Sequence, residues 1–288
     1  MVFKLKQPVS AGWLCDHAPL ELLGDRDKII SSVAPFDLAE RESLSFWGSN
    51  SAAKGTGSRS VFIAKREHSS TCTFSSNHPR LDFIRALSAL SSLIGFSDNN
   101  LPKKIDPSAN IGQNAFIAND VTIGANTTVE PNVCIFPNTH IGRNCIIRAN
   151  ATIGSSGFGF EREDDGTPIA FPHLGGVIIG DNVEIGACTC IAQGTLGNTV
   201  IQDNVKIDNL VHVAHNCIIE RNVFLIACAE LSGGVRIKEN SWVAPNASVN
   251  QKICVGANSL IGLGAVVVKD VVENDIVAGN PAKSIKRD

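Results

Sequence analysis

The stretch Ile201-Gln-Asp-Asn-Val-Lys-Ile-Asp-Asn-Leu-Val-His-Val-Ala-His-Asn-Cys-Ile-Ile219 repeats a pattern of six residues. Its aliphatic residues stand at every sixth position, and a small or β-branched residue follows each of them after four positions. A strand alternates with a period of two and a helix with a period of about 3.6, so neither alone fits this pattern. The pattern predicts three short strands per coil of about 18 residues, with a corner after each strand.

The same step of six extends over most of the chain. It runs from Ile105 to Ile153, resumes at Ile179 to Ile191, and continues from Ile201 to Val267, giving 24 aliphatic positions in phase. The third residue after each aliphatic one is often Asn or Asp, which tolerate the positive φ of a sharp corner. Stacked coils would bury the aliphatic column between parallel strands. An antiparallel sandwich is the alternative, but its hairpin loops would not keep the six-residue phase.

The period also divides the chain into parts. Residues 1–100 lack it and are expected to form a small α/β domain, with a strand at 61–64 and an amphipathic helix beginning at Pro79. The repeat is expected to form a triangular β-helix, or prism, over 101–272, followed by a tail over 273–288. An excursion from Ser155 to Gly176 and a bulge from Gly197 to Val200 interrupt the repeat. Long loops in compact domains are usually functional or disordered.

Composition excludes several classes of protein. Of the 288 residues 43% are hydrophobic and 18% charged, which is unlike a disordered or coiled-coil chain. The net charge of −3 gives no electrostatic reason to expect nucleic acid as a partner. No apolar run reaches the roughly 18 residues of a membrane span. The nine Cys include no C-x-x-C pair, which favours reduced thiols in a cytoplasmic protein.

One histidine stands out against the repeat. His215 falls on a corner, with the bulge at Gly197 one coil before it and Gly233 one coil after it. A corner imidazole beside a bare glycine backbone is a candidate base, although a solvated surface histidine is an equally good interpretation from the residues alone. His212 lies three positions away, a spacing at which side chains diverge, so no metal site is expected.

The chain further resembles a known enzyme family. Val177-Ile-Ile-Gly-Asp-Asn-Val-Glu-Ile-Gly-Ala187, Lys206 to Asn216 and the loop Gly157-Phe-Gly-Phe160 are similar to motifs of the UDP-3-O-acylglucosamine N-acyltransferases of lipid A synthesis. Ser32-Val-Ala-Pro35 and Pro79-Arg-Leu-Asp-Phe-Ile-Arg-Ala-Leu87 resemble the N-terminal part of that family. The resemblance implies a left-handed β-helix, an N-terminal nucleotide-sugar-binding domain and a homotrimer with sites between subunits.

The resemblance also implies a reaction and catalytic residues. A family member transfers a 3-hydroxyacyl group from acyl carrier protein to a sugar amine, and His215 would be its general base. The backbone N–H of Gly233 would be the oxyanion donor. This is sound chemistry, because an attacking amine must lose a proton and a histidine titrates near neutral pH. The developing oxyanion needs a fixed donor.

Further contacts to the sugar nucleotide follow from the resemblance. The family holds uracil with a Phe, an Asn and a Tyr; Phe46 is kept, the Asn is displaced to Asn50, and the chain contains no Tyr. The nucleotide is therefore expected to be either UDP or dTDP. The substrate-binding residues expected in this way are Phe46, Asn50, Phe158, Phe160, Asp208, Asn209, His212 and Asn216.

The C-terminal part departs from this family. Ile261-Gly-Leu-Gly-Ala-Val-Val-Val-Lys-Asp270 and Val277-Ala-Gly-Asn-Pro-Ala-Lys283 resemble sugar N-acyltransferases that use acyl-CoA. We therefore expect acyl-CoA as the co-substrate, with no bound cofactor. The lipid A enzyme with acyl carrier protein as donor is the first alternative, and a carbonic-anhydrase-like or non-catalytic trimer is the second. The donor-binding residues expected are Lys252, Gly264, Asn280, Pro281 and Lys283.

Overall fold

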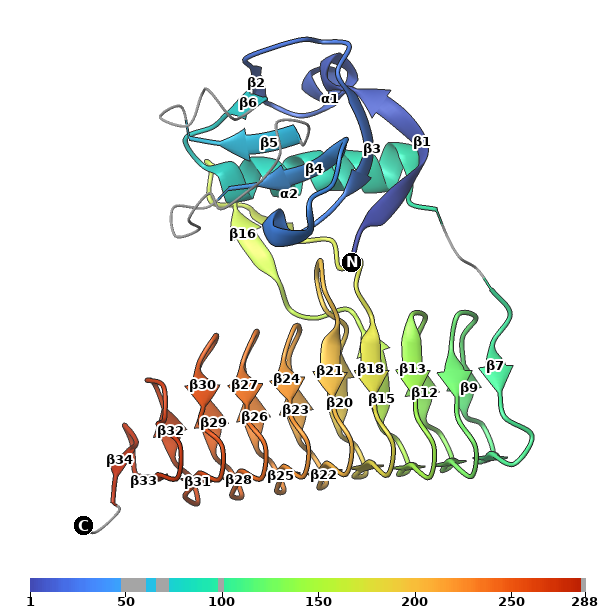
Figure 1. Cartoon of the computed structure of the whole chain (residues 1–288), viewed down its shortest axis with the longest axis vertical. Helices are drawn as coiled ribbons and strands as arrows, with labels where there is room; N and C mark the ends of the chain where they lie inside the picture. Colours follow the sequence, from blue (N-terminus) through green and yellow to red (C-terminus); the bar gives the residue numbers. More distant parts are fainter. Residues whose placement is uncertain (48–60, 66–72, 98–100, 286–288) are drawn as a thin grey trace. The chain divides into compact units, whose positions relative to one another are not determined.

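The computed structural model describes residues 1–47, 61–65, 73–97 and 101–285 (Figure 1). It divides the chain into two compact units. The N-terminal unit comprises Met1–Asn99 together with Gly159–Leu174. The prism comprises Asn100–Phe158 and Gly175–Asp288.

The N-terminal unit is built on one six-stranded mixed sheet with the order β1-β3-β4-β5-β6-β2. The central strands β3 to β6 run parallel, and β1 and β2 pair antiparallel at the two edges. The strand predicted at 61–64 is confirmed as β5. The bounds of the strands are β1 Phe3–Ser10, β2 Glu21–Leu22, β3 Ile29–Val33, β4 Ser43–Phe46, β5 Val61–Ala64 and β6 Phe74–Ser75.

Two helices and a short 3-10 turn complete the N-terminal unit. Helix α1 (Ala11–His17) begins after Ser10, whose side chain accepts the N–H of Trp13 as an N-cap. The turn η1 spans Phe36–Leu38. The predicted amphipathic helix is confirmed as α2 (Pro79–Ala89), with Pro in its first turn, and it continues as a π-helical segment, η3 (Leu90–Ile94).

The tip of the excursion is a hairpin of β16 (Phe160–Arg162) and β17 (Pro168–Ala170) that groups with the N-terminal unit. Helix α2 holds it through charged side chains, because Arg80 pairs with Glu161 at 2.8 Å and Arg85 pairs with Glu163. The hexapeptide period resumes after this hairpin and so predicts that it belongs to the prism, whereas the structure groups it with the N-terminal unit. Ion pairs between residues about 80 positions apart leave no periodic signal.

The prism has three parallel sheets, which we call faces 1, 2 and 3 in the order in which the chain meets them in each coil. Face 1 contains β7 Lys104–Ile105, β10 Thr122–Ile123, β13 Thr139–Ile141, β18 Val177–Ile179, β21 Thr199–Ile201, β24 Ile218–Ile219, β27 Arg236–Ile237 and β30 Cys254–Val255. Face 2 contains β8 Asn110–Ile111, β11 Thr128–Val129, β14 Ile146–Ile147, β19 Glu184–Ile185, β22 Lys206–Ile207, β25 Phe224–Leu225, β28 Trp242–Val243, β31 Leu260–Ile261, β33 Ile276–Ala278 and β34 Lys283–Ser284. Face 3 contains β9 Phe116–Ile117, β12 Cys134–Ile135, β15 Thr152–Ser155, β20 Cys190–Ala192, β23 His212–Val213, β26 Glu230–Leu231, β29 Ser248–Val249 and β32 Val266–Val267.

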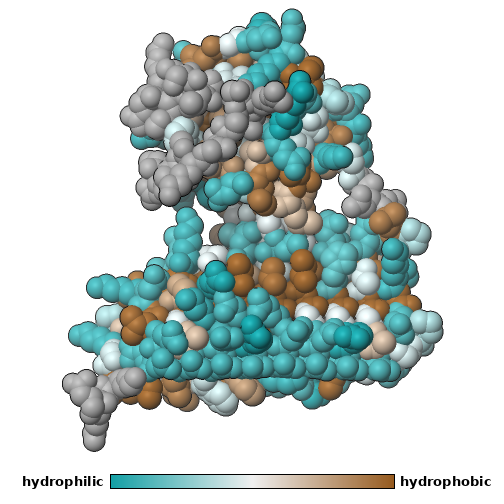
Figure 2. Space-filling view, viewed as in Figure 1, coloured by the Kyte–Doolittle hydropathy of each residue, from teal (hydrophilic) through white to brown (hydrophobic). Residues whose placement is uncertain are grey.

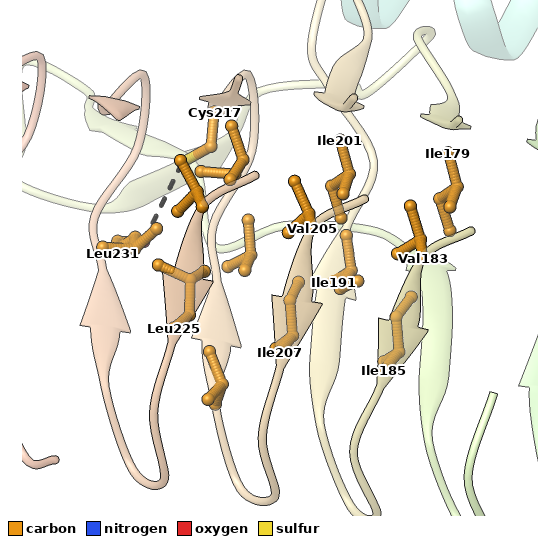
Figure 3. Packing of buried hydrophobic residues seen from close by; sticks show 14 of the residues in the cluster. Ile179, Val183, Ile185, Ile191, Ile201, Val205, Ile207, Cys217, Leu225 and Leu231 are labelled. Carbon is orange, nitrogen blue, oxygen red and sulfur yellow. Dashed lines mark hydrogen bonds between the residues drawn. The ribbon is translucent and has the colours of Figure 1, made fainter. Parts of the chain in front are cut away.

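The aliphatic column fills the interior of the prism, as the period predicts (Figure 3). Strands of successive coils pair in parallel, with a register shift, among the described strands of the prism, only between β15 and β20, so that Ile207 lies beside Leu225 and Val213 beside Leu231. Both Val213 and Leu225 are completely buried. The predicted fold class, a left-handed parallel β-helix with a small α/β domain, is confirmed. The prism extends past the predicted end at Val272, because β33 pairs with β31 and turns back into β34.

The corners adopt the conformation that the Asn and Asp pattern predicts. The corner Asn residues have φ between 56° and 62°, a region in which side chains other than Gly, Asn and Asp are disfavoured. Figure 2 shows a continuous hydrophilic band along the prism with hydrophobic side chains above it. Some outward apolar residues form rows; the rings of Phe224 and Trp242 stack with their centroids 5.1 Å apart on face 2.

Candidate active site

The edge between faces 3 and 1, the 3–1 edge, collects every interruption of the repeat. The excursion leaves the prism there after β15, and the bulge follows β20. The corners of the next three coils hold His215, Gly233 and Lys252 in sequence. Since each coil repeats the same three sides, residues that are far apart along the chain become neighbours along this edge.

His215 and Gly233 are in direct contact. A Cβ atom placed on Gly233 would lie 2.7 Å from Cε1 and 2.8 Å from Nε2 of His215, so the half-buried ring lies against the glycine backbone. The His215 carbonyl accepts the N–H of Gly234 at 2.9 Å, and the Gly233 carbonyl accepts the N–H of Lys252 at 3.0 Å. Within the described part of the chain, the N–H of Gly233 forms no hydrogen bond. The predicted pairing of an imidazole with a bare amide is thus present.

Asn216 joins this corner to the bulge. Its Nδ2 donates to the Gly197 carbonyl at 3.2 Å, and its Oδ1 accepts from the N–H and the hydroxyl of Thr195 at 3.1 and 2.8 Å. The same Oδ1 lies 3.1 Å from Nδ1 of His215. Thr195 stands just before the predicted bulge of 197–200, and no feature of the sequence there predicts that its side chain turns toward the next coil.

The bulge is in turn fixed against the point where the excursion returns to the prism. The N–H of Gly175 donates to the carbonyls of Gly194 and Thr195 at 3.0 and 2.9 Å. The N–H of Gly194 donates to the Gly176 carbonyl at 3.2 Å. These backbones approach so closely that a Cβ on Gly194 would collide with the Gly197 carbonyl. The glycines therefore allow the wall beside His215 to form.

His212 lies on face 3 near this edge. It is exposed on β23, in register with Cys190 on one side and Glu230 on the other. The Glu230 carboxylate accepts the Ser232 hydroxyl at 3.0 Å. His212 is thus on the outer surface beside the corner, where a bound substrate could reach it.

Asp208 and Asn209 lie elsewhere, at the corner between faces 2 and 3. The Asp208 carboxylate accepts the N–H of Asn209 at 2.7 Å and the N–H of Ala227 at 3.2 Å. Asn209 Oδ1 accepts the N–H of Ala187 at 2.7 Å. The structure does not bring them to His215 within one chain, since six residues of a coil carry the backbone to a different edge.

The expected aromatic contacts are spread over both units. Phe158, at the base of the excursion, has 90% of its surface exposed, whereas Phe160 is on β16 of the N-terminal unit. Phe46 is at the end of β4, with its ring 4.9 Å from that of Phe83. Asn50 lies outside the described residues.

The N-terminal unit has a cavity of about 330 Å³ that could receive part of a nucleotide sugar. Aromatic and cationic side chains line it, which suits a base and a diphosphate. Arg80 reaches both Glu161 and the ring of Phe171, 5.5 Å from its guanidinium carbon. The principal lining residues are Trp47, Lys65, His78, Arg80, Glu161 and Arg162.

The residues expected to bind the acyl donor form two groups. Lys252 is exposed on the 3–1 edge, one coil beyond Gly234. Gly264, at φ 64°, is on the corner between faces 2 and 3, and the cis Asn280–Pro281 bond lies in the turn between β33 and β34. Two backbone hydrogen bonds join that turn to the last coil. The N–H of Val266 donates to the Gly279 carbonyl, and the N–H of Ala282 donates to the Val266 carbonyl. The exposed Lys283 begins β34.

Two other properties bear on the class of protein. In residues 1–47, 61–65, 73–97 and 101–285, no three His, Cys, Asp or Glu side chains gather in an arrangement that could hold a metal ion. None of the helices in those ranges has the length and apolar character needed to cross a membrane.

Comparison with known proteins gives a consistent result. The family model described as bacterial transferase hexapeptide (six repeats) matches residues 120–155 and 198–233, the latter including His215 and Gly233. A UDP-3-O-acylglucosamine N-acyltransferase from Caulobacter sp. (strain K31) is 39% identical over 139 residues, which cover 48% of this chain and 41% of the relative. Another, from Chlorobium chlorochromatii (strain CaD3), is 51% identical over 89 residues, covering 31% of this chain and 25% of the relative.

A solved structure agrees with these matches. The UDP-N-acetylglucosamine acyltransferase of Francisella novicida has a TM-score of 0.58 and 31% identity, with 65% of this chain and 68% of that chain covered. The resemblance to UDP-3-O-acylglucosamine N-acyltransferases is confirmed by the curated relatives, of which the matched part of the chain spans less than half the length. These names favour the lipid A enzyme, the first alternative from the sequence, over the sugar N-acyltransferase that uses acyl-CoA.

Proposed function

We propose that this hexapeptide-repeat protein, whose prism is similar to those of UDP-3-O-acylglucosamine N-acyltransferases, transfers an acyl group from a thioester to the amine of a UDP-linked acylated glucosamine. The observation that carries the proposal is the contact between the His215 ring and Gly233, whose N–H has no acceptor in the described part of the chain. A base and an oxyanion donor are the two groups that this acyl transfer requires.

The steps of the reaction follow from this geometry. The amine nitrogen attacks the thioester carbonyl carbon while His215 accepts a proton from it. The negative charge that develops on the carbonyl oxygen is stabilised by the Gly233 N–H. The tetrahedral intermediate then collapses, the C–S bond breaks, and the proton held by His215 neutralises the departing thiolate. No covalent bond to the protein forms.

Three further parts of the proposal rest on the resemblance together with the site. The cavity of the N-terminal unit would hold part of the sugar nucleotide, because its cationic side chains suit a diphosphate. The chain would work as a homotrimer in the cytoplasm, with residues of a neighbouring subunit completing each site. The acyl donor would be acyl carrier protein, as the resemblance to the lipid A enzymes implies, or acyl-CoA, as the C-terminal sequence favours, so both donors must be assayed.

The test is the substitution His215→Ala, compared with His140→Ala. His140 is an exposed histidine on β13 of face 1, and strands β18 and β21 lie between β13 and β24, the strand that follows His215. We expect the first change to lower kcat about 10²- to 10⁴-fold and the second to leave it unchanged. Acyl transfer would be measured with UDP- and dTDP-linked amino sugars against both donors.

Each outcome decides one part of the proposal. Near-normal kcat after His215→Ala rejects His215 as the base. Transfer only to a dTDP sugar rejects the lipid A substrate but keeps the chemistry. No transfer with any pair, together with stoichiometric zinc by elemental analysis, would favour the metal-binding alternative instead.

A further inference from the structure

We propose that Asn216 is a positioning residue, which fixes the proton of the His215 ring on Nδ1 and so leaves Nε2 as the basic atom. This role differs from the substrate binding that the family resemblance implies for Asn216. The role of Nε2 in acyl transfer rests on the proposed function, whereas the position of the proton is a property of the free protein.

The orientation of the Asn216 amide is determined by its partners. Its nitrogen can only donate, and the Gly197 carbonyl at 3.2 Å can only accept. Its oxygen can only accept, and the Thr195 N–H at 3.1 Å can only donate. The two contacts lie on opposite sides of the amide and agree, so the oxygen and nitrogen cannot be exchanged.

This orientation determines the form of the neutral imidazole. Nδ1 of His215 lies 3.1 Å from the Asn216 oxygen, which has no hydrogen to donate. The hydrogen bond therefore requires the proton on Nδ1, and the lone pair of the neutral ring is then on Nε2. Nε2 is also close to Gly233, 2.8 Å from the place of a Cβ on that residue. The base and the oxyanion donor thus lie side by side.

Both atoms of the Asn216 amide are bonded within the protein. Besides His215, its oxygen accepts two bonds from Thr195, and its nitrogen donates to Gly197. Its own backbone N–H donates to the Thr199 hydroxyl at 2.9 Å, and its φ of 61° forms the corner. One residue therefore connects the ring, the bulge and the turn, which leaves little of its amide for a substrate.

The direct test is the position of the ring proton. Full-length protein labelled with ¹⁵N-histidine would be studied by NMR at a pH where the ring is neutral, with His215→Ala used to assign its signals. We expect a protonated Nδ1 and an unprotonated Nε2 in the wild type. In Asn216→Ala the ring should become a mixture of the two forms, whereas the control Asn222→Ala, a corner residue on another edge, should keep the wild-type signals.

Kinetics then separate positioning from substrate binding. Asn216→Ala should lower kcat at least about 10-fold, by less than His215→Ala, with little change in KM for the sugar nucleotide. Asn216→Asp keeps an acceptor for Nδ1 and should restore part of kcat, while its charge moves the acidic limb of the pH–rate profile to higher pH. The titratable residues at neighbouring positions of face 3 and of the 3–1 edge, His212, Glu230 and Lys252, are unchanged in both variants.

The proposal is overturned if the wild-type proton is on Nε2, or if Asn216→Ala leaves the proton position unchanged. A rise in KM at unchanged kcat would restore the substrate-binding role. If no substrate pair gives transfer, the proposed function fails, but the NMR result still decides the role of Asn216 in the free protein. The wild-type spectrum decides it even if Asn216→Ala does not fold.

Discussion

Two edges of the prism are built from the same repeat and differ in almost every other respect. On the edge between faces 1 and 2, the 1–2 edge, the corner residue with positive φ is always Asn in the coils from Asn126 to Asn274. Their amides form ladders along the edge, with bonds of 3.0 Å from Asn222 to Asn240 and 3.1 Å from Asn240 to Asn258. This edge repeats without a change from coil to coil.

The 3–1 edge is irregular over the same coils. It contains the excursion, the bulge, Asn216, Gly234 and Lys252 where the 1–2 edge has Asn each time. Asn216 forms no ladder with another Asn and instead bonds to Thr195, Gly197 and His215. The repeat thus supplies the scaffold on all sides, and departures from it mark where the candidate site is.

The largest effect on kcat is expected from Gly233→Ala on the irregular 3–1 edge. The added Cβ would collide with the His215 ring, with Cε1 at 2.7 Å, so the ring must move away from the amide. We expect kcat to fall at least about 10²-fold, as for loss of an oxyanion donor or of the base. Acyl-transfer assays and the melting temperature would be measured together.

Gly197→Ala is the matched control on the same edge. A Cβ there would meet Asn216 Nδ2 at 3.6 Å, an ordinary contact, and the carbonyl that Asn216 binds is retained. This variant should keep kcat within about threefold. Equal losses in both variants would mean that general disturbance of the edge, not the ring–glycine contact, controls activity.

The interior beneath the 3–1 edge gives a second, smaller effect. Cys217 is completely buried, and its thiol donates to the Ser232 carbonyl at 3.3 Å. Its sulfur also lies 4.0 Å from the Leu231 carbonyl, the hydrogen bond drawn in Figure 3. Burial raises the pKa of Cys217 from 9.0 to about 12. Between these pH values the folded state keeps a proton that the unfolded chain has lost. The free energy of unfolding should therefore be unaffected below about pH 9 and fall as the pH rises above it.

Cys217→Val removes this alkaline loss. Val235 occupies the corresponding inward position one coil later, so the side chain fits the column. From pH about 8 to about 10.5, wild type should lose at most about 2 kcal/mol more than the variant, measured by urea unfolding. Equal slopes for the two proteins would contradict the prediction.

The smallest effect is expected on the regular edge. Asn222→Ala removes amide bonds to two neighbours and places a disfavoured side chain at φ 59°. The free energy of unfolding should fall by about 1 kcal/mol, and kcat should not change. Asn222→Gly should lose less, because glycine adopts this φ without strain. A loss of kcat comparable to that of Asn216→Ala would remove the distinction between the two edges.

Much of the fold could be predicted because the repeat is short and local. The step of six identifies the inward residues, and counting one coil ahead correctly places Gly233 beside His215. The same counting would have separated Asp208 and Asn209 from His215. The resemblance assigned Asp208 and Asn209 to the substrate site, but strand β23 separates their corner from that of His215, and their side chains hold backbone amides of adjacent coils.

The spiral is predictable from the sequence, because the strands of a coil pair with those of the coils directly above and below, at a nearly constant separation along the chain. The sequence also determined which corner holds the imidazole. Two features become visible only in the folded chain. Asn216 connects His215 to the bulge through hydrogen bonds, and residues 159–174 group with the N-terminal unit. Those contacts join segments at irregular separations, where side-chain shape and hydrogen-bond direction select the partner and no periodic pattern records it.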